Sequence, residues 1–152
     1  MKIVHMTHFL KCMNNLEERI YCFANAGTLY GIHFQNNTRA QDKLLFCIKG
    51  RGIDYAIDLR KDSSTYLKWI SVELSEDNRK QIYIPKGFGH AFISLEHDTK
   101  NVMRFDEPFD SRYSRQIAYN DSEIGIIYPI DNPILAPHDI NAPTLENSDL
   151  NL

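Results

Sequence analysis

A chain of 152 residues with 43% hydrophobic residues, 24% charged residues and a net charge of −3 has the size and composition of one globular domain. Its apolar runs are too short for a membrane-spanning helix, and no block of like charges suggests a nucleic-acid partner. The first fifteen residues lack the apolar core of a signal peptide, and the three cysteines are widely spaced. We therefore expect a cytoplasmic protein with free thiols, folded as a single domain over residues 1–152.

The first predicted element is a short N-terminal helix over residues 9–23, where apolar residues recur at spacings of three or four. From residue 28 the pattern becomes that of strands. The segment IDYAIDL at 53–59 alternates apolar and acidic residues with a period of two. The turn at 49–52 predicts that this segment forms a hairpin with KLLFCI at 43–48.

Further strands are predicted at 66–74 and over 81–96, where Pro85 and two glycines should break the run into two strands at a bend. Later strand candidates lie at 101–105, 115–119 and 125–130. Residues 131–152 read as an irregular C-terminal tail, whose last ten or so residues should fray. Many short strands separated by turns, with few helices, indicate an all-β jelly-roll or cupin β-barrel.

His33 stands between two apolar residues of TLYGIHFQ (28–35), where it could be a metal ligand, a catalytic base or a hydrogen-bonded core residue. A metal-binding cupin would use an H-x-H pair and a later P-x-G-x-x-H element. The second element is present and supplies His90, but Gln35 stands where the first needs its second histidine. Catalytic zinc or iron sites normally take three protein ligands, so we expect no metal.

An imidazole in an apolar pocket can also act as a general base when a carboxylate orients it. Taken singly, each candidate residue has an ordinary structural explanation as well. His33 and His90 could be satisfied core histidines, Lys43 a solvated strand end and Asp139 a turn former. These alternatives stay open on the residues alone.

Several motifs follow one another in the order and approximate spacing of a known family. They are GIHFQ at 31–35, QDKL at 41–44, the strand pair at 52–65, the run at 72–92, YNDSEIGI at 119–126 and LAPHDINAP at 135–143. Together they resemble the dTDP-4-dehydrorhamnose 3,5-epimerase family over about residues 20–145. The resemblance implies a metal-free jelly-roll cupin without a cofactor, which is usually a homodimer and acts on a nucleotide-linked 4-keto-6-deoxy sugar.

Epimerisation beside a ketone removes a carbon-bound proton, passes through an enolate and returns a proton to the opposite face. The resemblance implies that His33 is the base, Asp139 the carboxylate that orients it and Lys43 the cation that stabilises the enolate oxygen. His90 is expected to line the same pocket. The candidate substrate-binding residues are His90, Tyr30, Gln35 and Arg104.

The chain departs from the family at Met103, at Tyr30 and at its N-terminus. Met103 stands where the family has its acid tyrosine, and a methionine cannot deliver a proton. The candidates to replace that tyrosine are Tyr113, Tyr55, Tyr83 and an ordered water. Tyr30 stands where the family has an arginine that clamps phosphate, and family members carry a further N-terminal segment.

Three functions remain in view. The first is an epimerase or isomerase of a nucleotide-linked keto sugar, whose reaction is restricted to one carbon or to one face of the sugar. The second is a catalytically silent relative that binds a sugar nucleotide or regulates a partner, and a third, weaker possibility is a cupin that serves only as an interaction protein. The retained base and carboxylate favour the enzyme, because a silent protein has no need of both.

Overall fold

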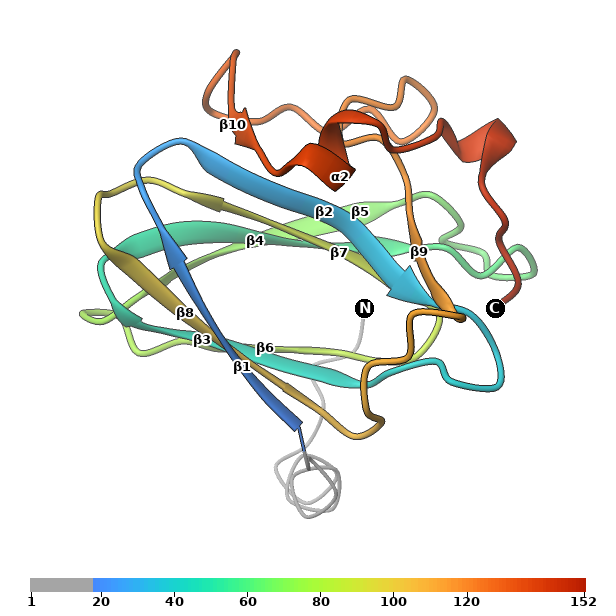
Figure 1. Ribbon diagram of the computed structural model, residues 1–152, viewed down its shortest axis with the longest axis horizontal. Coiled ribbons are helices and arrows are strands. Elements are labelled where there is room, and N and C mark those ends of the chain that lie inside the picture. The colour runs from blue at the N-terminus through green and yellow to red at the C-terminus, as the bar shows by residue number, and fades with distance from the viewer. Residues whose placement is uncertain (1–17) are drawn as a thin grey trace.

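Two β-sheets face each other in the structure, a computed structural model that describes residues 18–152 (Figure 1). One sheet has four strands, in the order β1 (Glu18–Ala24), β8 (Thr99–Phe105), β3 (Lys43–Lys49) and β6 (Gln81–Ile84). The other has six, in the order β10 (Ile134–Leu135), β2 (Thr28–Gln35), β7 (Phe88–Ser94), β4 (Arg51–Asp58) and β5 (Trp69–Ser75), with β9 (Ser114–Gln116) also paired to β2. The helices within residues 18–152 are α2 (Pro137–Ile140) and the 3₁₀-helix η1 (Leu145–Asn147). The predicted all-β jelly-roll architecture is confirmed.

The six-stranded sheet is covered on both faces. On its inner face Ala56 packs with Leu45 of the four-stranded sheet, and on its outer face Ile57 packs with Ile124 of the C-terminal segments. Figure 1 shows these segments, orange to red, lying over the sheet. Side chains alternate along a strand, so Asp54 shares the inner face with Ala56. Strand β4 is thus buried on both sides, and the Asp54 carboxylate points between the sheets, although the alternating pattern alone assigns the acidic face to solvent.

The N-terminal helix prediction is wrong where it can be compared with the structure. Residues 9–17 lie outside the described part of the chain, but Glu18–Ala24 form β1, which pairs with β8 along its whole length. Phe23 is 72% exposed, whereas Ala24 is buried, as expected for a period of two. Over so short a segment the apolar residues fit both a helical spacing of three or four and a strand period of two. Pairing with β8 decided in favour of the strand.

The predicted hairpin of 43–48 with 53–59 is also wrong. The segments form β3 and β4, which meet at Gly50 but lie in different sheets, since β3 pairs with β6 and β8 whereas β4 pairs with β5 and β7. Gly50 has a φ of +70°, and a Cβ there would lie 2.7 Å from Thr99 Oγ1. The tight turn therefore carries the chain across the sandwich. The break predicted at Pro85 is confirmed, because β6 and β7 also lie in different sheets.

The C-terminal segments are more ordered than the sequence suggests. Residues 125–130 form no strand, but 131–152 include β10 and both helices. Leu150 and Leu152 pack against the core, the Asn37 N–H donates to the Asn151 carbonyl (2.8 Å), and the Asn151 N–H donates to Asn36 Oδ1 (3.0 Å). The prediction of a frayed end is therefore wrong. No helix within residues 18–152 is long and apolar enough to cross a membrane.

Candidate active site

A cavity of about 360 Å³ lies between the two sheets. Its walls come from strands of both sheets and from loops at their ends. The lining residues are Tyr30, His33, Phe34, Gln35, Gln41, Lys43, His90, Met103, Phe105, Phe109, Ser114, Gln116 and His138. The sheet that carries β2 and β7 contributes the histidines at 33 and 90, and the four-stranded sheet contributes Lys43, Met103 and Phe105.

His33 and Asp139 form the shortest polar contact at this cavity. His33 Nε2 lies 2.6 Å from Asp139 Oδ1, although the residues are 106 positions apart in the chain. The Asp139 side chain is fully buried, whereas that of His33 is 29% exposed. With the carboxylate ionised, Nε2–H donates to it, which leaves the lone pair of Nδ1 free to accept a proton. The predicted meeting of these two residues is confirmed.

Local pairing explains how α2 reaches His33. Strand β10 runs parallel to β2, with Ile134 opposite Thr28, and so places the following residues beside the strand that carries His33. Pro137 begins the helix, where its missing N–H costs nothing. Gln116, the partner of His33 in the β2–β9 register, donates from Nε2 to the His138 carbonyl at 2.9 Å.

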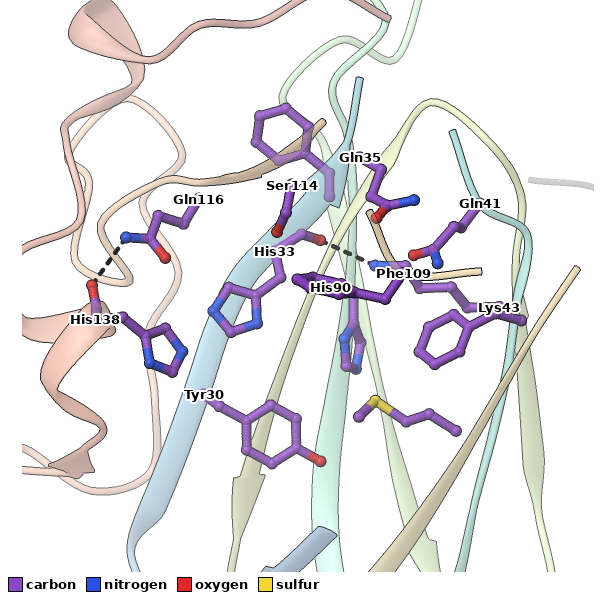
Figure 2. Close-up of a pocket in the computed structure, with 13 residues that line it drawn as sticks. Tyr30, His33, Gln35, Gln41, Lys43, His90, Phe109, Ser114, Gln116 and His138 are labelled. Atoms are coloured by element: carbon purple, nitrogen blue, oxygen red, sulfur yellow. Dashed lines mark hydrogen bonds between the residues drawn. The ribbon is translucent and has the colours of Figure 1, made fainter. Parts of the chain in front are cut away.

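Lys43 enters the cavity from the opposite side, as Figure 2 shows. Its Nζ donates to the His33 carbonyl at 3.1 Å, and the residue is only 4% exposed. Burial lowers the pKa of Lys43 from 10.5 to about 8, against the opposing effect of the Asp54 carboxylate. A cation is thus held at the backbone of His33, in a place with little water, where it interacts strongly with a developing negative charge.

His90 pairs with Asp54, a residue that the sequence analysis did not single out. His90 Nε2 lies 3.1 Å from Asp54 Oδ2, and both side chains are buried. Burial lowers the pKa of His90 and raises the pKa of Asp54. Among the described residues, nothing donates a hydrogen bond to Asp54 Oδ1. No local signal marked this carboxylate, because an alternating pattern assigns the acidic face of a strand to solvent.

Tyr30 lines the cavity three residues before His33 on β2. Its hydroxyl accepts a hydrogen bond from Asn101 Nδ2 at 2.8 Å, and its ring stacks on Phe92 with centroids 5.4 Å apart. Burial raises the pKa of Tyr30, so the hydroxyl stays neutral. The position that the resemblance assigns to a phosphate-clamping arginine therefore holds an uncharged aromatic side chain.

Met103 lines the wall opposite His33, as its place on β8 requires. None of the three tyrosines proposed to replace the acid is among the lining residues. Tyr55 instead packs edge-on against Trp69 and Tyr128 in the core. Within the described part of the chain, Tyr30 is the tyrosine that reaches the cavity.

Gln35 and Arg104 lie differently from the other predicted substrate-binding residues. Gln35 lines the cavity but joins two loops, since its Nε2 donates to the Arg39 carbonyl and its Oε1 accepts from the Asp110 N–H, both at 2.7 Å. Arg104 is not a lining residue. Its neighbours on β8, Met103 and Phe105, line the cavity, and side chains alternate along a strand, so Arg104 faces away from it.

His138 is a lining residue that the sequence analysis did not select. Its side chain is 59% exposed, and its Nε2 lies 3.5 Å from Asp139 Oδ2. Its ring centroid lies 5.4 Å from that of His33. The signal available in the sequence was its position next to Asp139 in the motif at 135–143.

Comparison with known proteins identifies the family. Residues 5–147 match the family model described as dTDP-4-dehydrorhamnose 3,5-epimerase. An enzyme of that name from Shigella flexneri is 37% identical over 81% of this chain and 68% of its own length. A dTDP-4-dehydro-6-deoxyglucose 3-epimerase from Streptomyces sp is 31% identical over 83% of this chain and 65% of its own. The chain thus spans about two thirds of the length of these curated relatives.

The fold comparison agrees. A crystal structure of dTDP-4-dehydrorhamnose 3,5-epimerase from Bacillus anthracis, with TDP and PPi bound, has a TM-score of 0.86 and 35% identity. The match covers 91% of this chain and 81% of that one. Sequence and structure together show that the chain belongs to the dTDP-4-dehydrorhamnose 3,5-epimerase family.

Proposed function

We propose that this chain removes a proton from a carbon next to the ketone of a nucleotide-linked 4-keto-6-deoxy sugar, as a sugar-nucleotide epimerase. The observation that carries the proposal is the 2.6 Å contact between His33 and Asp139 at a cavity that also holds Lys43. His33 Nδ1 is the base. Asp139 holds the imidazole in the required tautomer and stabilises the imidazolium that forms.

Lys43 is assigned to the enolate oxygen. Removing a proton beside a ketone moves negative charge onto that oxygen, and a fixed cation in a cavity with little water stabilises the charge by a few kcal/mol, or about a hundredfold or more in rate. Lys43 and His33 come from facing sheets, so a sugar between them can present its oxygen to one and its C–H bond to the other.

The nucleotide-linked substrate is supported by the relatives. The Bacillus anthracis structure contains TDP and PPi, and the Streptomyces relative is named for a dTDP-linked 4-dehydro-6-deoxy sugar. The resemblance places a phosphate-clamping arginine at the position of Tyr30, which brings no charge. We therefore expect the diphosphate to be bound more weakly, or by other residues, than in relatives with the arginine.

A second candidate reaction follows from the wall opposite His33. With Lys43 at the enolate oxygen, Met103 and Phe105 leave the far face of the sugar without a proton donor from that sheet. Loss of the C3 proton gives an enediolate across C3 and C4. If the C3 hydroxyl proton then passes to the C4 oxygen and His33 returns its proton to C4 on the same face, the ketone moves to C3 and no centre is inverted. An isomerase of this kind, or an epimerase of one carbon that uses water as the acid, is the alternative to epimerisation at both carbons.

Proton exchange in heavy water tests the proposed function. The chain is incubated with dTDP-4-keto-6-deoxyglucose in D₂O. Deuterium at C3 and C5, and at C4 of any product with a shifted ketone, is measured by mass spectrometry and NMR. We expect incorporation at C3, C5 or both, and its loss in His33→Ala. The matched control is His97→Ala, because His97 is an exposed loop residue that does not line the cavity.

Each outcome of this experiment is informative. Deuterium with inversion supports an epimerase, and deuterium with a shifted ketone supports the isomerase. Binding of the sugar nucleotide without exchange would instead support the catalytically silent relative. Exchange that survives in His33→Ala would contradict the assignment of the base.

We also infer a homodimer. Strand β1 lies at the edge of the four-stranded sheet, so one side of its backbone lacks a partner strand among the described residues, and Phe23 on this strand is 72% exposed. Long unpaired edges with exposed apolar side chains favour pairing with another chain. Sedimentation equilibrium should give the mass of two chains, and a stable monomer would contradict the inference.

We further infer that the protein works in the cytoplasm. Cys22 and Cys47 are free thiols, as is usual where the environment is reducing. Cell fractionation with detection of the chain in each fraction tests the inference, and recovery outside the cytoplasm would contradict it.

A further inference from the structure

Three metal-ligating side chains meet at the edge of the cavity. They are His33, His138 and Asp139, and one ligand atom from each lies within 4.8 Å of the others. We expected no metal because His33 and His90 lack a third ligand. The structure brings together a different set, in which β2 supplies one ligand and α2 supplies two.

Asp139 Oδ2 gives a second reason to expect a cation beside these residues. The atom is buried, and no described residue donates a well-formed hydrogen bond to it. The nearest polar group is His138 Nε2 at 3.5 Å, too far for a good hydrogen bond. A buried carboxylate oxygen without a donor is costly, and a cation relieves that cost.

The spacing suits a small divalent cation. Zinc binds histidine nitrogen and carboxylate oxygen at about 2.0–2.2 Å, so two ligands of a tetrahedral ion lie roughly 3.3 Å apart. His138 Nε2 lies 3.5 Å from Asp139 Oδ2, which is close to this value. His33 Nε2 lies 2.6 Å from the other carboxylate oxygen, Oδ1. An ion that binds both oxygens would replace the proton shared with His33 and would require that contact to open by roughly 0.7 Å.

We propose that His33, His138 and Asp139 form a binding site for Zn²⁺, which inhibits the enzyme when occupied. Three protein ligands with one open position are the usual number for an exchangeable zinc site. His33 and His138 are 29% and 59% exposed, so an ion can enter from the cavity.

Inhibition follows from the atoms involved. Zinc on His33 Nε2 takes the place of the N–H that Asp139 holds, so the ring proton must sit on Nδ1. The base then has no lone pair to offer the substrate. This consequence rests on the proposed function, whereas zinc binding does not, so binding is measured separately in the absence of any sugar nucleotide.

Calorimetric titration of the untagged full chain with ZnCl₂ tests the site. We expect one ion per chain, and binding on the order of tenfold weaker or more in His138→Ala, because that variant lacks one of three ligands. His138→Ala leaves the His33–Asp139 pair in place, and its exposed position lets the fold tolerate the change. Circular dichroism of each variant confirms folding.

Two controls separate this site from other histidines. His97→Ala removes an exposed histidine from a loop, and His5→Ala/His8→Ala removes the two near the N-terminus, which lie outside the described residues. Both should bind zinc like the unsubstituted chain. Absence of binding, equal binding by His138→Ala, or loss of binding only in His5→Ala/His8→Ala would each overturn the site.

Deuterium exchange with and without zinc tests inhibition, with each variant compared with its own zinc-free rate. At a zinc concentration that saturates the unsubstituted chain but not His138→Ala, exchange should stop in the former and be largely retained in the latter. Full exchange by the zinc-saturated chain would overturn inhibition even if binding is confirmed. Absence of exchange without zinc would contradict the proposed function and leave the titration result intact.

Discussion

His33 on β2 and Asp139 on α2 lie 106 positions apart in the chain and 2.6 Å apart in space. Two pairings produce this contact: β10 runs beside β2, and β9 ties the α2 backbone to the same region through Gln116. The base and its carboxylate are therefore held by elements from opposite ends of the chain. Substitutions at this pair should affect proton transfer more than folding.

Asp139→Asn tests the orienting role of the carboxylate. The amide keeps the shape of the side chain but can donate to Nε2, which favours the tautomer with its proton on Nδ1. We expect the exchange rate to fall by about a thousandfold or more, with little change in the substrate concentration needed for half-saturation. A rate within tenfold of the unsubstituted chain would show that His33 does not depend on this partner.

Lys43 predicts an alkaline limit to activity. Its pKa of about 8 means that the ammonium loses its charge as the pH rises through this value, so exchange should decline above pH 8. In Lys43→Arg the guanidinium stays charged, and the decline should move to higher pH. Lys43→Met should lose about a hundredfold in rate. The measurement is the pH profile of exchange, and an unchanged alkaline limb in Lys43→Arg would assign the limb to another group.

Met103→Tyr tests whether the far wall lacks an acid. The new phenol would lie across the cavity from His33, where it could protonate the enolate on the opposite face. We expect the ratio of inverted product to deuterium exchange to rise. Met103→Phe adds a ring of similar size without the hydroxyl and is the matched control. An equal ratio in both variants would show that the supply of protons to this face does not limit inversion.

Asp54→Ala tests the buried pair beneath the cavity. His90 would keep its buried ring but lose its partner, so the free energy of unfolding should fall by about 1–3 kcal/mol, the cost of leaving a buried polar group unpaired. Lys49→Ala is the control, because Lys49 pairs with Asp98 at the surface at 3.4 Å and should contribute less than about 1 kcal/mol. Urea denaturation at neutral pH measures both. A loss at position 54 no larger than at 49 would contradict a stabilising pair.

The sequence by itself determined the class of fold. Period-two patterns, Pro85 and the turn residues predicted most of the strands and the break between β6 and β7. The ordered motifs also predicted the family and the residues that meet at the cavity. These features are local, or lie in motifs whose order is visible along the chain.

Tertiary structure decided what depends on long-range contacts. Pairing with β8 made residues 18–24 a strand, and the crossing at Gly50 turned an expected hairpin into a link between sheets. The same folding buried Asp54 beside His90, turned Arg104 away from the cavity and placed His138 beside the base. Local pattern cannot specify which strands become neighbours, because hydrogen bonding and burial between distant segments outweigh the preferences of any short stretch.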